Sequence, residues 1–299
     1  MNCPYNVIRY YCKMINKKNP DNEPKYLIIP AAGLGTRMKS VNPDLPKELL
    51  PVGKKPAIQY AVEEGVSAGI NNIIIIISRQ KEIIRKYFED EEISRTLFPG
   101  AADEMKEILR NVFFHFLYQK EPLGESDAIG CAGKIAGSHS VAVVHPDDIY
   151  FPAPGVLKAL KPVYNQYKTD VIALMGVTDK NAAGLGNSGR VNLRRMNGNV
   201  YRIETFIPKS QGYFMPRFKG ELRSCGMSIL GPHIFEYIEK VRAHVREGEF
   251  TNLPVLDAIS RERGFLGYSL PGTFFDIGNP KGYELSLKYV QESHFRSDE

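Results

Sequence analysis

The sequence predicts an α/β fold with a doubly wound, mainly parallel sheet at its centre. Residues 27–29 are an apolar run before a glycine turn, residues 56–68 have the apolar spacing of an amphipathic helix, and residues 73–77 are five consecutive isoleucines. Only a strand buried on both faces carries such a run of isoleucines comfortably. Strand, helix and strand in this order form a right-handed parallel crossover, the unit from which doubly wound sheets are built.

The same periodicities place the elements that follow. Strands are expected at 112–118, 141–144, 171–177 and 200–206, and helices at 80–89, about 101–110, 154–167 and 232–245. A chain of 299 residues is long enough to bury roughly 75% of its unfolded surface. We therefore expect one large domain with at most an appendage.

The composition is that of an ordinary soluble globular protein. Charged residues make up 24% of the chain, and 39 basic against 34 acidic residues leave a modest net charge of +5. The basic residues form no block with interleaved aromatics, so no nucleic-acid partner is expected. No apolar run approaches the roughly eighteen residues of a membrane span, so no membrane contact is expected.

The cysteines and the start of the chain bear on location. Cys3, Cys12, Cys131 and Cys225 form no CxxC pair and are too few for a disulfide scaffold, which favours a cytoplasmic protein. Residues 1–24 lack the continuous apolar core of a secretory signal. We expect them to be an N-terminal appendage, either a short helix that packs on the domain or on another subunit, or a disordered chain end.

The stretch 27–51 has the layout of a phosphate site. Its strand runs directly into Gly33 and Gly35, which have no Cβ to keep a ligand from the backbone. Successive backbone N–H groups in such a turn form an anion cradle. Arg37 and Lys47 supply two cations that a bent loop can bring to phosphate oxygens, one as a planar fork and one as a point charge.

Two better-known phosphate motifs do not explain this stretch. The dinucleotide fingerprint and the P-loop both require glycine at position 38, where this chain has Met38. The segment from Gly33 to Arg37 alone would indicate a plain turn about as often as a site. Its interpretation therefore depends on the sequence that follows.

Three consecutive motifs resemble the signature of the sugar-1-phosphate nucleotidyltransferases. They are Gly33-Leu-Gly-Thr-Arg-Met38, Pro46-Lys-Glu-Leu-Leu-Pro51 and Lys55-Pro-Ala-Ile-Gln-Tyr60. The uridylyl enzymes that act on glucose 1-phosphate are most similar, followed by the thymidylyl enzymes. The resemblance covers about residues 25–292, strongly in the first half and in patches between 180 and 225.

This resemblance implies a Rossmann-like sheet of the nucleotidyltransferase (glycosyltransferase A-like) type, with a small additional β and helical region in the second half. It implies a nucleotidyltransferase domain over 25–299, with a nucleotide-binding half of about 25–150 and an acceptor-binding half of about 151–299. It also implies a homo-oligomer. Residues 223–230 resemble a family strand, 252–259 a family helix, and 272–280 a segment that opens a last helix to about residue 291.

The resemblance implies two loops that hold the nucleotide. In the first, the triphosphate is bound by Ala31, Ala32, Gly33, Leu34, Gly35, Thr36 and Arg37. The second resembles the base-recognition loop of the family and contributes Gln119 and Gly124, although a plain strand-to-helix loop is the alternative. An amide side chain and an exposed glycine backbone can read the edge of a pyrimidine without crowding it.

Two aspartates are expected to hold magnesium. The strand 141–144 ends in His145-Pro-Asp-Asp148, at the edge where doubly wound sheets bind ligands. Adjacent aspartates on an extended chain point to opposite sides, so normally only one faces the site. The resemblance selects Asp147, leaves Asp148 as the reserve, and supplies Asp276 as the second carboxylate.

The acceptor site is where the sequence departs from the family. Relatives carry a Glu-Lys-Pro triplet that engages the sugar phosphate and ring, but residues 203–209 read Ile-Glu-Thr-Phe-Ile-Pro-Lys. Either Glu204 and Lys209 supply the same groups from shifted positions, or the acceptor differs from glucose 1-phosphate. Gly226 matches a glycine that lies against the sugar, and Gly189 loosely matches another whose neighbouring tyrosine is absent.

The implied reaction is transfer of a nucleoside monophosphate from an NTP, expected to be UTP, to a sugar 1-phosphate, expected to be glucose 1-phosphate. The two polyanions repel, so cations matter more than an acid or a base. The resemblance implies Mg²⁺ on Asp147 and Asp276, with Arg37, Lys47 and Asp147 as catalytic residues. The alternatives are a cytidylyl or uridylyl transferase for another phosphorylated acceptor, and a catalytically weak nucleotide-sugar-binding regulatory protein.

Overall fold

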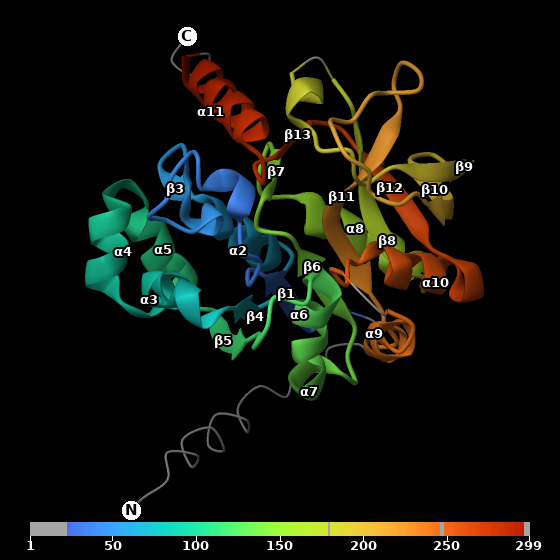
Figure 1. Cartoon of the computed structure of the whole chain (residues 1–299), viewed down its shortest axis with the longest axis horizontal. Helices are drawn as coiled ribbons and strands as arrows, with labels where there is room; N and C mark the ends of the chain where they lie inside the picture. The colour runs from blue at the N-terminus through green and yellow to red at the C-terminus, as the bar shows by residue number, and fades with distance from the viewer. Residues whose placement is uncertain (1–22, 179, 246–247, 296–299) are drawn as a thin grey trace, which may run out of the picture.

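The computed structural model describes residues 23–178, 180–245 and 248–295, and its centre is one nine-stranded sheet (Figure 1). In spatial order the strands are β5 (Phe113–Tyr118), β4 (Asn72–Ile77), β1 (Tyr26–Pro30), β6 (Val141–Val144), β11 (Leu222–Leu230), β8 (Val171–Gly176), β12 (Leu266–Leu270), β10 (Val200–Phe206) and β9 (Val191–Asn197). The helices are α2 (Ala57–Ser67), α3 (Glu82–Glu89), α4 (Glu91–Leu97), α5 (Ala102–Leu109), α6 (Glu125–Cys131), α7 (Gly133–Ala136), α8 (Val156–Tyr167), α9 (Ile234–Arg242), α10 (Leu253–Arg263) and α11 (Pro280–Phe295).

Most strands of the large sheet run in one direction. Parallel pairings join β5, β4, β1 and β6, and β8 and β12 form another parallel pair. Only β11 and β10 run against the other strands of this sheet. The prediction of a mainly parallel α/β sheet is therefore confirmed.

The isoleucine run Ile73–Ile77 lies in β4, between β1 and β5, and each of its side chains is fully buried. Ile73, Ile75 and Ile77 share a core with side chains of α2, α3, α5 and α8. Ile74 and Ile76 enter a second core with α6, α7, α9 and α10. Because helices cover both faces, an alternation of polar and apolar residues is not tolerated in this strand.

A third, smaller core forms the additional β and helical region. β7 (Asp148–Phe151) pairs antiparallel with β13 (Thr273–Asp276), and α11 packs beside them. This core also takes Met38 and Val52 from the first half of the chain, the latter from the short hairpin β2 (Pro51–Val52) and β3 (Lys55–Pro56). The pairing places Asp276 opposite Asp148.

The elements that were not predicted from the sequence include α4, β7, β9 and β12. α4 is a short, charged helix whose backbone N–H groups of Glu92 and Ile93 are capped by the Asp90 carboxylate. Exposed polar residues follow one another along β9, which forms the edge of the sheet. Neither element carries the apolar periodicity on which the prediction depends.

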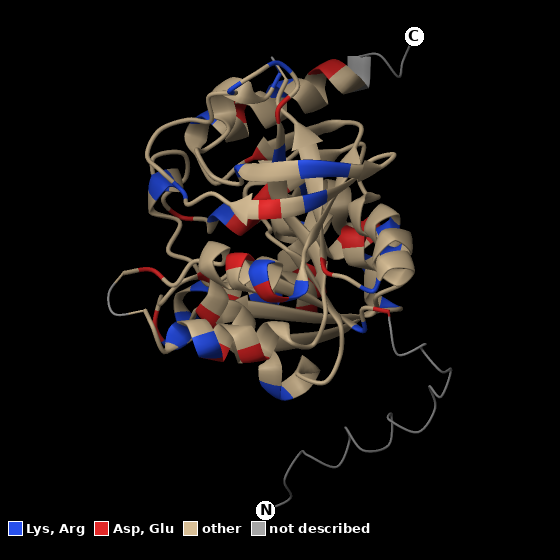
Figure 2. Cartoon of the chain, turned by 90° about the vertical axis from the view of Figure 1, so that its right-hand side faces the viewer, with Lys and Arg blue, Asp and Glu red and all other residues tan. Residues whose placement is uncertain are grey.

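Several expectations concern the chain as a whole. Residues 1–22 of the expected appendage lie outside the described residues. The sheet draws strands from both expected halves, and the division near residue 150 stays a prediction. Basic and acidic residues are interspersed along the helices and strands (Figure 2). In the described ranges no helix is both long and apolar enough to cross a membrane.

Candidate active site

Several of the predicted ligand residues gather where the parallel strands end. The glycine turn follows β1, Gln119 follows β5, and residues 145–148 follow β6. β11 runs the other way, so its first half, which includes Gly226, reaches the same edge beyond the end of β6. The carboxyl edge of such a sheet is where crevices for ligands form.

The glycine turn keeps its backbone open to a ligand. A Cβ on Gly33 would meet nothing within 4 Å, and Gly35 has φ +62°, a left-handed conformation that side chains rarely adopt. Arg37 is exposed in the short 3₁₀ turn Thr36–Met38. Met38 is 2% exposed and packs in the third core. The methionine that excludes the P-loop motif is thus a core residue and leaves the turn clear.

A buried ion pair ties the turn to the Lys47 segment. Lys81 Nζ donates to both oxygens of Glu48, at 2.8 and 2.7 Å, and to the carbonyl of Ala31 at 2.9 Å. Burial lowers the pKa of Lys81, and the Glu48 carboxylate acts against this shift. Sequence reasoning missed Lys81, because no motif distinguishes it from the other lysines. The pair holds Ala31 close to the residue that follows Lys47.

Lys47 and Asp147 form an ion pair at this edge of the sheet through Nζ and Oδ2. Burial opposes ionisation of Asp147, but the Lys47 ammonium outweighs it and holds the pKa of that carboxyl at about 2. Burial also opposes the charge on Lys47, but the neighbouring Asp147 carboxylate raises the pKa of Lys47 above its ordinary value. Both groups are therefore charged at neutral pH.

Asp148 has a different partner from Asp147. Its Oδ2 accepts a hydrogen bond from the backbone N–H of Gly226 at 2.6 Å. Burial and the charges of Asp147 and Asp276 raise the pKa of Asp148 to about 7. A Cβ on Gly226 would overlap Asp148 Oδ2 and the ring of His145. This position therefore requires glycine for packing alone.

Asp276 is the last residue of β13. Its Oδ2 accepts from the backbone N–H of Gly186 at 3.2 Å, and its Oδ1 accepts from that of Gly278 at 3.0 Å. The next residue, Ile277, donates its backbone N–H to the carbonyl of Asp147 at 2.8 Å. The two predicted metal carboxylates are thus held on adjoining backbone segments.

Asp147 and Asp276 fit magnesium by chemistry and placement. A Cβ on Gly278 would lie 2.5 Å from Asp147 Oδ2 and 3.0 Å from Asp276 Oδ1, so both carboxylates border the space that the missing side chain leaves. Magnesium prefers oxygen ligands and keeps several waters, so it commonly takes one or two protein carboxylates. No group of three or more His, Cys, Asp or Glu residues arranged for a metal occurs among the residues described.

Gln119 is buried with both of its amide hydrogens engaged. Nε2 donates to the carbonyl of Gly124 at 2.9 Å and to Asp127 Oδ2 at 2.7 Å. Because both partners are acceptors, they fix the orientation of the amide and leave Oε1 as its group for a ligand. Gly124 has φ +121°, and a Cβ there would lie 2.6 Å from the backbone N and O of Phe250.

Glu125 and His145 form a second ion pair at this edge, through Oε1 and Nε2. Burial opposes the charge on His145, but the Glu125 carboxylate outweighs it and raises the pKa of His145 to about 9. Burial likewise opposes ionisation of Glu125, and His145 reverses this so that the pKa of Glu125 is lowered. Sequence reasoning assigned no role to either residue. Their only signal was position, beside Gly124 and two residues before Asp147.

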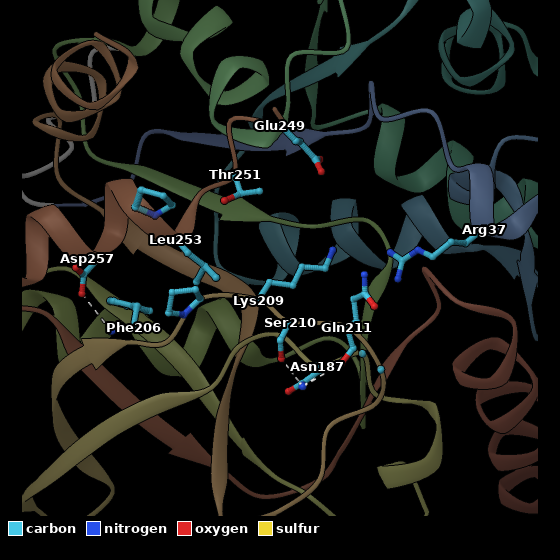
Figure 3. A pocket seen from close by; sticks show the side chains of 14 residues that line it. Arg37, Asn187, Phe206, Lys209, Ser210, Gln211, Glu249, Thr251, Leu253 and Asp257 are labelled. Carbon is cyan, nitrogen blue, oxygen red and sulfur yellow. Dashed lines mark hydrogen bonds between the residues drawn. The ribbon is translucent and has the colours of Figure 1, made fainter. Parts of the chain in front are cut away.

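A cleft of about 750 Å³ lies between the glycine turn and the loop after β10 (Figure 3). Arg37 and Lys209 extend toward one another across it. Among the described residues, no carboxylate pairs with either cation. Gly186, whose backbone N–H donates to Asp276, also lines the cleft, so Asp276 lies next to one of its lining residues. Its lining further includes Asn187, Gln211, Glu249, Thr251 and Asp257.

The loop that carries Lys209 is held by hydrogen bonds. Asn187 Nδ2 donates to Ser210 Oγ at 2.6 Å, and the backbone N–H of Asn187 donates to the carbonyl of Gly212 at 3.0 Å. At the other end of the loop, the buried Glu221 carboxylate accepts from Arg190 and Arg217, each at 2.7 Å. These bonds fix Lys209 relative to the cleft.

Of the four predicted acceptor residues, Lys209 lines this cleft, whereas Gly189, Glu204 and Gly226 do not. Glu204 lies on β10, where its carboxylate pairs with Arg194 Nε at 3.3 Å and both side chains are more than half exposed. Gly189 has φ +73° and packs against Ser224, whose backbone N–H donates to the Gly189 carbonyl at 2.7 Å. The structure brings Lys209 to the cleft and Gly226 to the carboxylates, and it leaves Glu204 apart from both.

Fold and site together define a class of protein. A glycine turn with an open backbone, the Arg37 side chain and the Lys47–Asp147 ion pair lie with Asp276 near the carboxyl edge of a mainly parallel sheet. This arrangement suits a transferase for polyphosphate substrates. The family model described as nucleotidyl transferase matches residues 26–292, and the chain belongs to that family.

Individual relatives agree with this assignment. UTP–glucose-1-phosphate uridylyltransferase 1 of Staphylococcus saprophyticus is 31% identical over 283 residues, which cover 92% of this chain and 96% of the relative. UTP–glucose-1-phosphate uridylyltransferase YngB of Bacillus subtilis is 33% identical over 85% of both chains. A solved structure of UDP-glucose pyrophosphorylase complexed with UDP-glucose covers 90% of this chain and 100% of that chain, with a TM-score of 0.73 and 27% identity. The predicted family and fold are confirmed, whereas the roles of single residues stay predictions.

Proposed function

We propose that the chain transfers the uridylyl group of UTP to glucose 1-phosphate, with release of pyrophosphate. The names of its relatives support both substrates. The observation that supports UTP as the nucleotide substrate is the fixed amide of Gln119, whose Oε1 can accept a hydrogen bond from the N3–H of uracil. Gly124 presents its backbone beside that amide.

In the reaction, an oxygen of the sugar phosphate bonds to the α-phosphorus of UTP. The bond from this phosphorus to the bridging oxygen of the β-phosphate breaks, and pyrophosphate leaves with that oxygen. The N–H groups of residues 31–36 and the Arg37 guanidinium bind the departing phosphates. Lys47 moves from Asp147 to the oxygens between donor and acceptor, and Lys209 binds the sugar phosphate from the opposite wall of the cleft.

Asp147 and Asp276 would hold magnesium in this scheme. When bound, Mg²⁺ neutralises charge on the α-phosphate and on the attacking phosphate. The Lys47 ion pair keeps the Asp147 carboxylate ionised before substrates arrive. The backbone N–H groups of Gly186 and Gly278 orient Asp276 toward the same space.

The broken Glu-Lys-Pro triplet favours one second candidate, a uridylyl or cytidylyl transferase for another phosphorylated acceptor. Pyrophosphate release from UTP, dTTP and CTP, each combined with several sugar 1-phosphates, separates the two. We expect UTP with glucose 1-phosphate to react fastest. A faster reaction with another acceptor would favour the second candidate, and nucleotide binding without turnover would favour a regulatory protein.

We also propose an oligomeric state and a cellular compartment for the protein. We infer a homo-oligomer that works in the cytoplasm. The thiols of Cys131 and Cys225 form no disulfide, which supports a reducing compartment, while Cys3 and Cys12 lie outside the described residues.

Gln119→Met is expected to remove the preference for UTP over CTP. It should lower kcat/KM with UTP about tenfold to a hundredfold, the effect of a lost hydrogen bond to a buried partner. The value with CTP should fall much less, because the cytosine N3 is an acceptor and gains nothing from Oε1 of Gln119. The measurement is the ratio of kcat/KM for the two triphosphates.

Gln166→Met is the matched control, since Gln166 is exposed on α8. Its ratio should equal that of the wild-type chain. If the ratio of kcat/KM for UTP to that for CTP in Gln119→Met equals the wild-type ratio, the Gln119 amide does not recognise the base.

A further inference from the structure

We propose that Glu125 and His145 recognise the hydroxyl groups of a sugar ring, and that the ring is the ribose of UTP. The inference rests on the proposed function, because it takes Gln119 and Gly124 as the base site and Asp147 as the site of the α-phosphate. It adds a specificity-determining pair to that nucleotide site.

The pair lies between two groups that one nucleotide must reach. Glu125 directly follows Gly124 of the base loop, and His145 lies two residues before Asp147. Their side chains meet through Oε1 and Nε2. The ribose joins the base to the α-phosphate, so a nucleotide bound at both ends must pass its ribose beside this contact.

The exposure of the pair suits contact with a ligand. The side chains of His145 and Glu125 are 22% and 29% exposed, whereas those of Lys81 and Glu48 are 9% and 1% exposed. Lys81 and Glu48 hold two segments of the fold together away from solvent. Glu125 and His145 instead retain surface at the edge where ligands bind.

Both side chains are carried by well-fixed segments. The backbone N–H of His145 donates to the carbonyl of Gly226 at 2.8 Å, and its ring occupies the space that a Cβ on Gly226 would take. Next to Glu125, Ser126 donates its backbone N–H to Phe250 and its hydroxyl to the carbonyl of Thr251, each at 3.0 Å. The pair is therefore placed before a ligand arrives, which favours specific recognition.

The chemistry of the pair matches hydroxyl groups better than phosphate. Glu125 contributes a carboxylate, which repels phosphate, in contrast to the cations Arg37 and Lys209 that extend into the cleft. Glu125 retains acceptor lone pairs, and His145 retains Nδ1, which lies 4.0 Å from Asp148 Oδ2 and thus beyond hydrogen-bond distance. A carboxylate oxygen and a ring nitrogen near one another complement a vicinal diol, since each hydroxyl can both donate and accept.

Binding of UTP, 2′-deoxy-UTP and 3′-deoxy-UTP tests the proposal by calorimetry with Mg²⁺ and no acceptor. The wild-type chain should bind UTP about tenfold or more tightly than at least one deoxy analogue, the effect of one lost hydrogen bond. The double variant Glu125→Leu, His145→Leu removes both charges together and leaves neither unpaired. It should bind UTP and the deoxy analogues equally, through weaker binding of UTP.

Two further variants serve as controls for this binding experiment. Glu125→Met keeps about the length of the side chain but removes its acceptor oxygens. Loss of discrimination in that variant at an unchanged melting temperature rules out a folding defect as its cause. Lys240→Met with Glu262→Gln removes an exposed ion pair between α9 and α10 and should leave the discrimination unchanged.

The same variants are then assayed for turnover with glucose 1-phosphate and its deoxy analogues. Loss of discrimination among these acceptors alone would assign the pair to the acceptor sugar. Equal weakening of all nucleotides, with acceptor selectivity unchanged, would show a structural ion pair only and overturn the proposal. If glucose 1-phosphate is not the acceptor, turnover is absent in every variant, while the binding comparison still reports on the ribose.

Discussion

The Asp147→Asn variant is expected to turn over about a thousandfold more slowly than the wild-type chain. Asparagine keeps the size of the side chain but removes the negative charge that would hold Mg²⁺ and that pairs with Lys47. Metal ions contribute several kcal/mol of charge stabilisation to such reactions, and about 1.4 kcal/mol corresponds to a tenfold change in rate. Pyrophosphate release at saturating substrates, measured across a range of Mg²⁺ concentrations, gives both the rate and the metal requirement.

Asp148→Asn is the matched control because it makes the same chemical change one residue away. Asp148 accepts from the Gly226 backbone and has no contact with Lys47, and its pKa is raised to about 7 by burial and by its acidic neighbours. Burial and the neighbouring carboxylates thus disfavour the charged form of Asp148. We expect an effect of at most about tenfold, the value of one hydrogen bond. Near-normal, Mg²⁺-dependent turnover in Asp147→Asn, or an equally large loss in Asp148→Asn, would contradict the assignment.

The parallel part of the fold was predictable because its strands are buried on both faces. Ile73–Ile77 and Val141–Val144 are unbroken apolar runs. A strand buried on both faces accommodates such a run better than any other kind of secondary structure does. The mixed part was less predictable. In β9 the side chains of Arg194, Arg195 and Met196 are exposed at the sheet edge, so pairing with β10 rests on backbone hydrogen bonds that leave no pattern in the sequence.

The candidate site divides in the same way. Arg37, Lys47 and Asp147 lie in contiguous motifs, so the sequence predicts them without knowledge of the fold. Their supports lie far apart in the chain: Lys81 reaches back to Ala31, and His145 reaches Glu125. A side chain that acts through a distant partner has no local signature, because the contact is created by the topology of the sheet.

The acceptor side was only partly predictable for a physical reason. Glu204 and Lys209 were named together because they are near in sequence, but Glu204 lies on strand β10 and Lys209 in the loop that follows. The strand directs Glu204 to Arg194, and the loop directs Lys209 into the cleft. Two side chains that are five residues apart therefore need not point to the same site when the end of a strand lies between them.

Gly278→Ala is expected to lower kcat/KM at least about a hundredfold, the effect of displacing catalytic groups by about 1 Å. The new methyl carbon would lie 2.5 Å from Asp147 Oδ2 and 3.0 Å from Asp276 Oδ1, too close for either carboxylate to keep its position. The backbone N–H of residue 278 remains and can still donate to Asp276, so the variant tests the space between the carboxylates and not that hydrogen bond. A titration of turnover with Mg²⁺ should show a higher requirement for the metal.

Gly176→Ala is the control for the added methyl group, since a Cβ on Gly176, at the end of β8, would meet nothing within 4 Å. Its turnover should stay within about twofold of the wild-type chain, as for other substitutions away from such features. The melting temperature separates displacement of the carboxylates from general unfolding: displacement predicts a large loss of turnover in Gly278→Ala with a folded chain. Unchanged turnover and an unchanged Mg²⁺ requirement in a folded Gly278→Ala chain would show that Asp147 and Asp276 do not share a metal in this space. The added methyl group carries no charge and removes no ligand. A large loss of turnover in a folded Gly278→Ala chain would therefore show that catalysis depends on the positions of the Asp147 and Asp276 carboxylates.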